Sequence, residues 1–176
     1  MLSYVDILTG RPEKALRRLK SYQKLFEKTD PLNFHFGIGL AYMASQMPEP
    51  ALEEFKKADA LVMEDEVPKK RERYFWEAVA QLEIGNLPEA EKLTREIEHL
   101  LPGFLRKSDS NIPYLWGRLE LARKNLPDAR KLLDEAVAHC PGEYNFQSIE
   151  TNALYLDSLA SAFLEMGDAD NALKNY

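Results

Sequence analysis

The same short sequence, typical of the start of a helix, occurs twice in this chain. Residues 85–93 read GNLPEAEKL, and residues 124–132 read KNLPDARKL. Both stretches place Asn-Leu-Pro, an acidic residue and Ala in the same order. Asn86 and Asn125 can cap the first free N–H groups of a helix. The proline then falls in the first helical turn, where its missing N–H has no cost. The stretches therefore predict two helices that begin in the same way.

The same pattern extends along the whole chain when the alanine after each opening is used as an anchor. Five anchors are separated by 36, 39, 39 and 43 residues, and they are Ala15, Ala51, Ala90, Ala129 and Ala172. Twelve residues before each anchor stands a small residue: Ser3, Gly39, Ala78, Gly117 and Ala160. A small residue on one helix lets a second helix approach closely. The spacing therefore predicts a series of helical hairpins.

These hairpins resemble the tetratricopeptide repeat. The fullest match consists of His35, Ile38, Gly39, Tyr42, Ala51, Phe55 and Ala58. The resemblance implies an all-α fold, a right-handed superhelix of antiparallel helix pairs (a TPR-like α-solenoid), in one array over residues 1–176. The expected units are 1–31 (partial), 32–70, 71–109, 110–152 and 153–176 (partial). We expect this array to be a segment of a longer protein, because arrays usually end in polar capping elements.

The sequence departs from the family pattern in the third unit and in its spacing. Polar residues replace apolar or aromatic ones at Glu77, Gln81 and Thr94. The spacing exceeds the usual ~34 residues, so extended helices or loops are expected at 64–70, 103–110 and 142–148. Trp116 is expected in the core, because it stands beside the small Gly117.

Composition narrows the classes of partner and compartment. The net charge of −6 disfavours nucleic acid, whose phosphates would repel the chain. No apolar run approaches the ~20 residues of a membrane span. The single cysteine, Cys140, allows no disulfide within the chain and fits a reducing compartment, which favours a cytoplasmic location.

The residues that could carry chemistry are scattered. His35, His99 and His139 fall in different units, and none has a second His or Cys at metal-ligand spacing on one helix face. Cys140 lacks a visible base or oxyanion pocket. We therefore expect no catalytic site, no metal and no cofactor.

The resemblance also implies a binding surface, because first helices line the concave face in this family. Helical spacing from the small residues places a partly apolar stripe there: Phe36, Leu40, Phe75, Trp76, Val79, Tyr114, Arg118 and Asp157. The alternative is that the aromatic members pack against neighbouring units. The Lys, Asn and Arg clamp that some family members use for a partner's C-terminal carboxylate is not present at the corresponding positions.

We therefore expect a non-catalytic scaffold that binds a peptide or helix of a protein partner in this groove. One alternative is a self-assembly or spacer module, in which incomplete terminal repeats form a homo-oligomer. Another is a regulatory repeat domain of a larger multidomain signalling protein. Neither nucleic acid nor a membrane is an expected partner.

Overall fold

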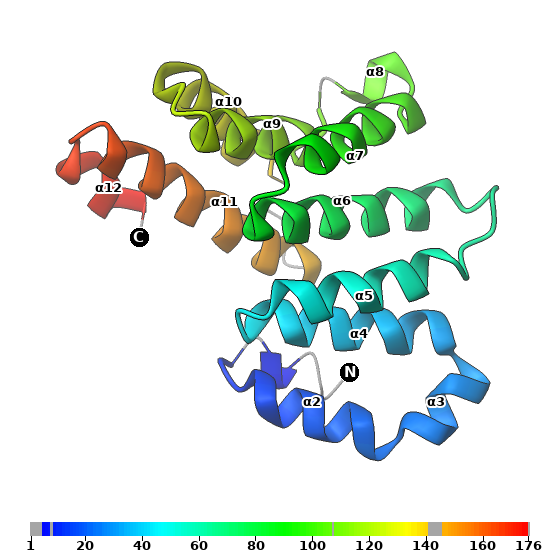
Figure 1. The fold of residues 1–176 in the computed structure, drawn as a ribbon. Helices are drawn as coiled ribbons and strands as arrows, with labels where there is room; N and C mark the ends of the chain where they lie inside the picture. Colours follow the sequence, from blue (N-terminus) through cyan, green and yellow to red (C-terminus); the bar gives the residue numbers. More distant parts are fainter. Residues whose placement is uncertain (1–4, 8, 107, 141–145, 176) are drawn as a thin grey trace. The chain divides into compact units, whose positions relative to one another are not determined.

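The computed structural model describes residues 5–7, 9–106, 108–140 and 146–175, and the side chains of residues 146–152 are not described. Every regular element in these ranges is a helix (Figure 1). The chain divides into two units, Met1–Glu89 and Ala90–Tyr176, with the boundary inside α7. The helices are α2 (Pro12–Ser21), α3 (Gln23–Thr29), α4 (Pro31–Ala44), α5 (Pro48–Asp59), α6 (Val67–Ile84), α7 (Leu87–Leu100), α8 (Gly103–Arg106), α9 (Asn111–Ala122), α10 (Leu126–His139), α11 (Phe146–Glu165) and α12 (Ala169–Asn175).

The same turn joins the two helices of every hairpin. One residue in each turn has a positive φ, and these residues are Gly10, Gln46, Gly85, Lys124 and Gly167. Each stands five residues before an anchor alanine. The N–H of the next residue donates to the carbonyl five residues back at 2.8–3.0 Å in all five turns, as in Asn125 to Glu120. This is the Schellman ending of a helix, and it recurs at the spacing of the anchor alanines.

Close helix packing explains the small residues. All five anchor alanines are buried. A Cβ added to Gly39 would meet the Phe55 ring at 2.4–3.0 Å, and one added to Gly117 would meet Leu133 Cγ at 2.7 Å. Phe55 and Leu133 both stand four residues after an anchor. The large second-helix side chain therefore occupies the space that glycine leaves on the first helix.

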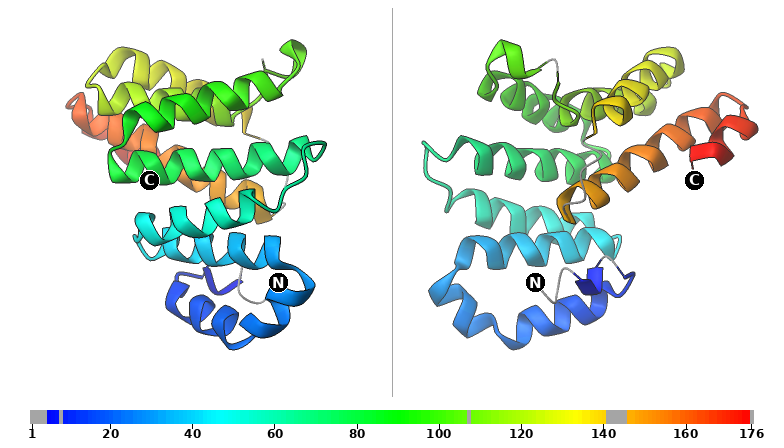
Figure 2. Two further views of the ribbon diagram at one scale, coloured as in Figure 1. Left: turned by 45° about the vertical axis from the view of Figure 1, so that its right-hand side comes forward. Right: turned by 180° about the vertical axis from the view of Figure 1, so that it is seen from behind.

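Unit 1 is built from α2 to α6. Helix α4 packs on α5, and α5 packs on α6, so that these three lie side by side (Figures 1 and 2). Their core is a cluster of buried residues that comprises Phe36, Leu40, Ala51, Leu52, Phe55, Ala58 and Ala80. A smaller cluster of Leu19, Phe34 and Ile38 joins α2 to α4. The core therefore continues from one hairpin to the next.

Unit 2 repeats this arrangement with α9 to α12. Helix α10 packs on both α9 and α11, and α12 packs on α11. The rings of Tyr114 on α9 and Tyr155 on α11 lie 4.6 Å apart. First helices of successive hairpins therefore also contact each other.

Helical residues occupy part of each of the three expected extensions. Helix α6 already begins at Val67, with Pro68 in its first turn, so only the first part of 64–70 is a loop. The connection 103–110 contains α8, and in 142–148 the residues from Phe146 onward belong to α11, whereas 142–145 lie outside the described residues. Helix α3 was not expected at all.

The prediction that Trp116 lies in the core is wrong. Its side chain is half-buried, its Nε1 donates to Glu98 Oε1 at 2.8 Å, and the Arg95 guanidinium carbon lies 5.1 Å from the centroid of its ring. The core position beside Gly117 belongs instead to Leu133, which is fully buried. The residue before the glycine points along a different radius of the helix, about 100° away.

The capping predictions have mixed outcomes. Asp168 caps α12 as expected, because its Oδ1 accepts the Asn171 N–H at 3.2 Å. Asn125 makes no side-chain cap. Its amide instead donates to Glu120 Oε2 at 2.8 Å and to Asp128 Oδ2 at 2.7 Å, so these neighbouring carboxylates orient the Asn125 side chain away from the helix N–H groups.

Candidate functional site

The eight residues predicted to line a groove differ in their exposure. Phe36, Leu40, Phe75, Val79 and Tyr114 are buried, Trp76 and Arg118 are half-buried, and Asp157 is exposed. Phe36 to Val79 belong to unit 1, and Tyr114, Arg118 and Asp157 belong to unit 2. The two groups are therefore described separately.

In unit 1 the predicted groove residues Phe36 and Leu40 are part of the core. The centroid of the Phe36 ring lies 5.7 Å from that of Phe55 and 3.2 Å from the guanidinium carbon of Arg73. Leu40 belongs to the same cluster. Trp76 packs at the edge of this core, 6.4 Å from Phe55, and keeps part of its surface accessible.

In unit 2 the predicted residue Arg118 forms hydrogen bonds with side chains of α9 and α11. Arg118 Nη1 donates to Tyr114 Oη at 2.9 Å and to Ser158 Oγ at 3.4 Å. The guanidinium is thus held between α9 and α11, and the exposed Asp157 stands beside Ser158 in the sequence. Burial raises the pKa of Tyr155, whose ring packs on Tyr114, so this tyrosine is neutral over the physiological range.

The burial of five members favours the alternative in which the aromatic stripe packs against neighbouring helices. What remains accessible to a partner is Trp76 in unit 1 and Arg118 with Asp157 in unit 2. An aromatic face and an oriented guanidinium are both common anchors in protein interfaces.

Among the carboxyl groups of unit 1, Glu77 on α6 has the most strongly shifted pKa. Its side chain is 7% exposed, and its Oε1 is buried and forms no hydrogen bond within the described part of the chain. Burial raises its pKa to about 7, with a further contribution from Asp59, and Lys56 opposes the rise. The sequence pattern flagged this position as a polar replacement, but gave no measure of its burial.

Several other titratable groups of unit 1 form local ion pairs. His35 Nδ1 lies 2.7 Å from Glu54 Oε2. Burial of Glu54 opposes its ionisation, but hydrogen bonds from Lys57 and His35 outweigh this and lower its pKa. Among the described residues, no group of three or more His, Cys, Asp or Glu side chains is arranged to hold a metal ion. Across the same residues, none of the helices combines the length and apolar character needed to span a bilayer.

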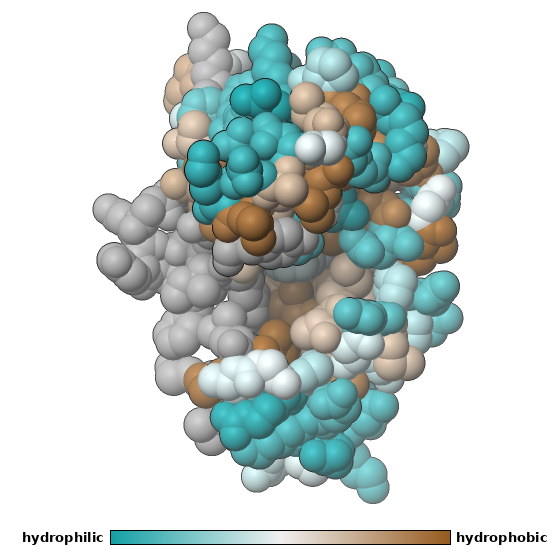
Figure 3. All heavy atoms as spheres, turned by 90° about the vertical axis from the view of Figure 1, so that its left-hand side faces the viewer, coloured by the Kyte–Doolittle hydropathy of each residue, from teal (hydrophilic) through white to brown (hydrophobic). Residues whose placement is uncertain are grey.

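Large apolar side chains also reach the surface outside the predicted stripe. On the face drawn in Figure 3, hydrophobic side chains lie among hydrophilic ones. Over the whole described part of the chain, the exposed large apolar side chains include Tyr22, Leu25 and Phe26 around α3, and Leu164 and Leu173 on α11 and α12. Sequence reasoning missed the α3 group, although its signal, YQKLF with flanking lysines, is visible in the sequence.

Solved structures share this fold. MamA of Desulfovibrio magneticus RS-1 aligns with a TM-score of 0.58 and 21% identity, over 99% of this chain and 86% of that one. A Podosopora anserina protein with nearly identical TPR-like repeats aligns with a TM-score of 0.63 and 19% identity, over 99% and 88%. The Cut9–Hcn1 hetero-tetramer of the APC/C aligns with a TM-score of 0.67 and 13% identity, over 97% of this chain and 30% of that one. No family model and no curated protein sequence matches the chain. The fold is that of a tetratricopeptide-like helical repeat protein, and the all-α class predicted from the sequence is confirmed.

Proposed function

We propose that this chain is a non-catalytic scaffold that binds a peptide or helix of a protein partner on the faces of its first helices, in a cytoplasmic setting. The observation that carries the proposal is that different residues of a hairpin pack its helices together and remain accessible at its surface. Buried anchor alanines and their large neighbours hold the two helices together, whereas Trp76, Arg118 and Asp157 on first helices stay accessible.

The chemistry of these positions indicates the kind of segment that binds. Trp76 offers an aromatic face to an aliphatic or aromatic anchor. Arg118, held by two hydroxyl groups, is already oriented, so little side-chain entropy is lost when it meets a carbonyl or carboxylate of the partner. In unit 1 an apolar anchor of an extended or helical segment fits Trp76, and in unit 2 an acceptor group of such a segment fits Arg118.

Selection from a random peptide library on the immobilised chain tests the proposal. We expect selected peptides to share apolar anchors and to lose at least ~1.4 kcal/mol of affinity with Trp76→Ser or Arg118→Gln. Arg95→Gln is the matched control, because Arg95 is an exposed arginine on a second helix. Peptides whose affinity is the same for all variants would refute binding on the first-helix faces.

Self-assembly is a second candidate, and it is favoured by Leu173. This residue follows the anchor Ala172 as Leu52 follows Ala51. Leu52 is 9% exposed in the core cluster that includes Ala80 of the next hairpin, whereas Leu173 is 74% exposed. The residue after the anchor alanine, which is buried in the core of unit 1, is therefore exposed to solvent on α12. Sedimentation velocity decides: a concentration-dependent dimer that Leu173→Asp abolishes supports assembly, and a monomer at all concentrations excludes it.

A further inference from the structure

Helix α3 differs from the other described helices of seven or more residues because it buries none of its side chains. It nevertheless contains Leu25 and Phe26, which are 56% and 36% exposed, and it follows Tyr22, which is 54% exposed. Burying a large apolar side chain contributes about 1.5–3 kcal/mol. The open apolar side of α3 is therefore a surface from which a partner could gain binding energy.

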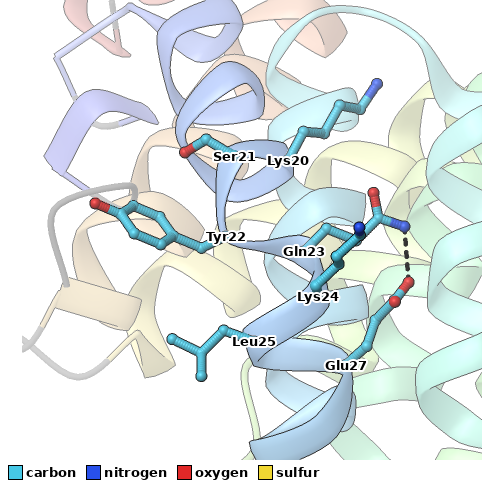
Figure 4. A pocket seen from close by; sticks show the side chains of 7 residues that line it. All are labelled: Lys20, Ser21, Tyr22, Gln23, Lys24, Leu25 and Glu27. Carbon is cyan, nitrogen blue, oxygen red and sulfur yellow. Dashed lines mark hydrogen bonds between the residues drawn. The ribbon is translucent and has the colours of Figure 1, made fainter.

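The aromatic side chains of this segment have defined positions. Phe26 stacks on Phe34 of α4 with centroids 6.3 Å apart, and Tyr22 meets the Phe26 ring edge-on at 6.2 Å. Tyr22 and Leu25 point to the same side of a shallow pocket, whereas Lys20 and Lys24 point to the other (Figure 4). The contacts with α4 hold the apolar group in place without covering it.

The segment that carries these apolar side chains is strongly basic. Residues 11–28 contain seven Lys or Arg against two Glu, a net charge of +5. Some of these cations are occupied, since Lys14 and Arg18 pair with Asp6. Three others, Arg17, Lys24 and Lys28, are exposed and pair with no carboxylate in the described part of the chain.

We propose that this basic and apolar surface, the α2–α3 surface (Arg17, Tyr22, Lys24, Leu25, Phe26 and Lys28), docks a short acidic protein segment that carries aliphatic or aromatic anchors. The apolar side chains of the segment cover Tyr22 and Leu25, and its carboxylates meet the unpaired cations. The site is distinct from the first-helix faces, so its test is independent of that proposal.

Charge distribution favours a short acidic segment over an anionic bilayer. The whole chain carries −6 and residues 11–28 carry +5, so the remaining residues carry −11. Electrostatic interactions are screened beyond about 8–10 Å at physiological salt. A short segment bound at this surface therefore experiences mainly the local positive charge. A bilayer presents its negative charge over an area larger than this surface, so the net negative charge of the residues outside 11–28 opposes its approach.

The test uses a fluorescein-labelled helical peptide with Leu at every third or fourth position and Glu at the others. Its control peptide has Lys in place of each Glu. Fluorescence anisotropy with the full chain is expected to show binding of the acidic peptide alone, weakened as salt rises. Two double variants should each weaken binding at least about ten-fold. One combines Lys24→Glu with Lys28→Glu, and the other combines Tyr22→Ser with Leu25→Ser.

Matched variants in unit 2 control for general charge and hydrophobicity. Lys131→Glu changes an exposed lysine, and Phe104→Ser changes an exposed phenylalanine; both should leave peptide binding unchanged. All substituted residues are exposed, so melting curves should coincide with that of the wild type. Equal binding of both peptides, or of all variants, overturns the proposal.

Two further measurements test whether a membrane or a second copy of the chain, and not an acidic segment, binds the α2–α3 surface. The chain is mixed with vesicles of phosphatidylcholine and phosphatidylserine, and its own mass is followed against concentration. We expect neither vesicle binding nor self-association that depends on Lys24 and Lys28. Either result, when the acidic peptide fails to bind, would overturn the proposal in favour of a membrane or a second copy of the chain.

Discussion

Neutralising Glu77 should stabilise the protein at neutral and alkaline pH. The carboxyl group lies in the interior of unit 1 with its Oε1 unpaired, and its pKa rises from 4.5 to about 7 chiefly because of burial. Asp59 on α5 and Glu89 at the start of α7 add to the rise, and Lys56 on α5 opposes it. Glu77→Gln removes the ionisation and keeps the size of the side chain.

The magnitude follows from the displacement of the pKa. A tenfold change in proton affinity corresponds to about 1.4 kcal/mol, so the ionised carboxylate destabilises the folded state by at most about 3 kcal/mol. The folded state binds the proton more tightly than the unfolded state. Wild-type stability is therefore highest below pH 4.5 with respect to this group, falls as pH rises, and reaches its low plateau above about pH 7.

The assay uses the two tryptophans, which lie in different units. In a Trp116→Phe background, the fluorescence of Trp76 reports on unit 1 beside the substitution. Urea unfolding is followed at about pH 5 and about pH 8. The free energy of unfolding of the Glu77→Gln variant should exceed that of its parent by about 2–3 kcal/mol at the higher pH. At the lower pH the difference should be much smaller.

The control is Glu83→Gln, which changes an exposed glutamate on the same helix. Its effect on the pH dependence of the free energy of unfolding should be much smaller than that of Glu77→Gln. The reasoning would be refuted if Glu77→Gln and its parent showed parallel pH dependence. It would also be refuted if Glu77→Gln lowered the free energy of unfolding of unit 1 equally at both pH values. That result would mean that the ionised Glu77 carboxylate is stabilised by its surroundings in the folded state.

Three further predictions concern the hairpins, and each is measured by urea unfolding. Gly39→Ala should destabilise unit 1 by about 1–3 kcal/mol, since its Cβ would overlap an aromatic ring, whereas Gly103→Ala, with no atom within 4 Å of the added Cβ, should have little effect. Gln46→Gly should add about 1 kcal/mol by relieving a positive φ of 57°; a loss of stability would mean that the turn is not strained. Trp116→Ala should cost less than Leu133→Ala, for which about 2–5 kcal/mol is expected; the reverse order would return the tryptophan to the core.

The sequence alone determined the repeat register of this protein. Anchor alanines, the small residues twelve positions earlier and the turns between them recur at spacings that can be counted without a structure. The anchors are buried, and the five positive-φ turns fall at the same intervals. These features are local: a tight turn and a close helix pair within one hairpin depend on residues that are near in sequence. The Asp168 cap was predictable for the same reason.

Only the tertiary structure decided how each helix face is covered. Helical periodicity identifies the side chains that share a face, but the neighbour that packs on that face comes from another hairpin. Most of the predicted groove is buried for this reason, and Leu133 rather than Trp116 fills the space beside Gly117. The same contacts bury Glu77 and leave α3 uncovered. Burial depends on packing between residues far apart in sequence, and the repeat pattern does not encode that packing.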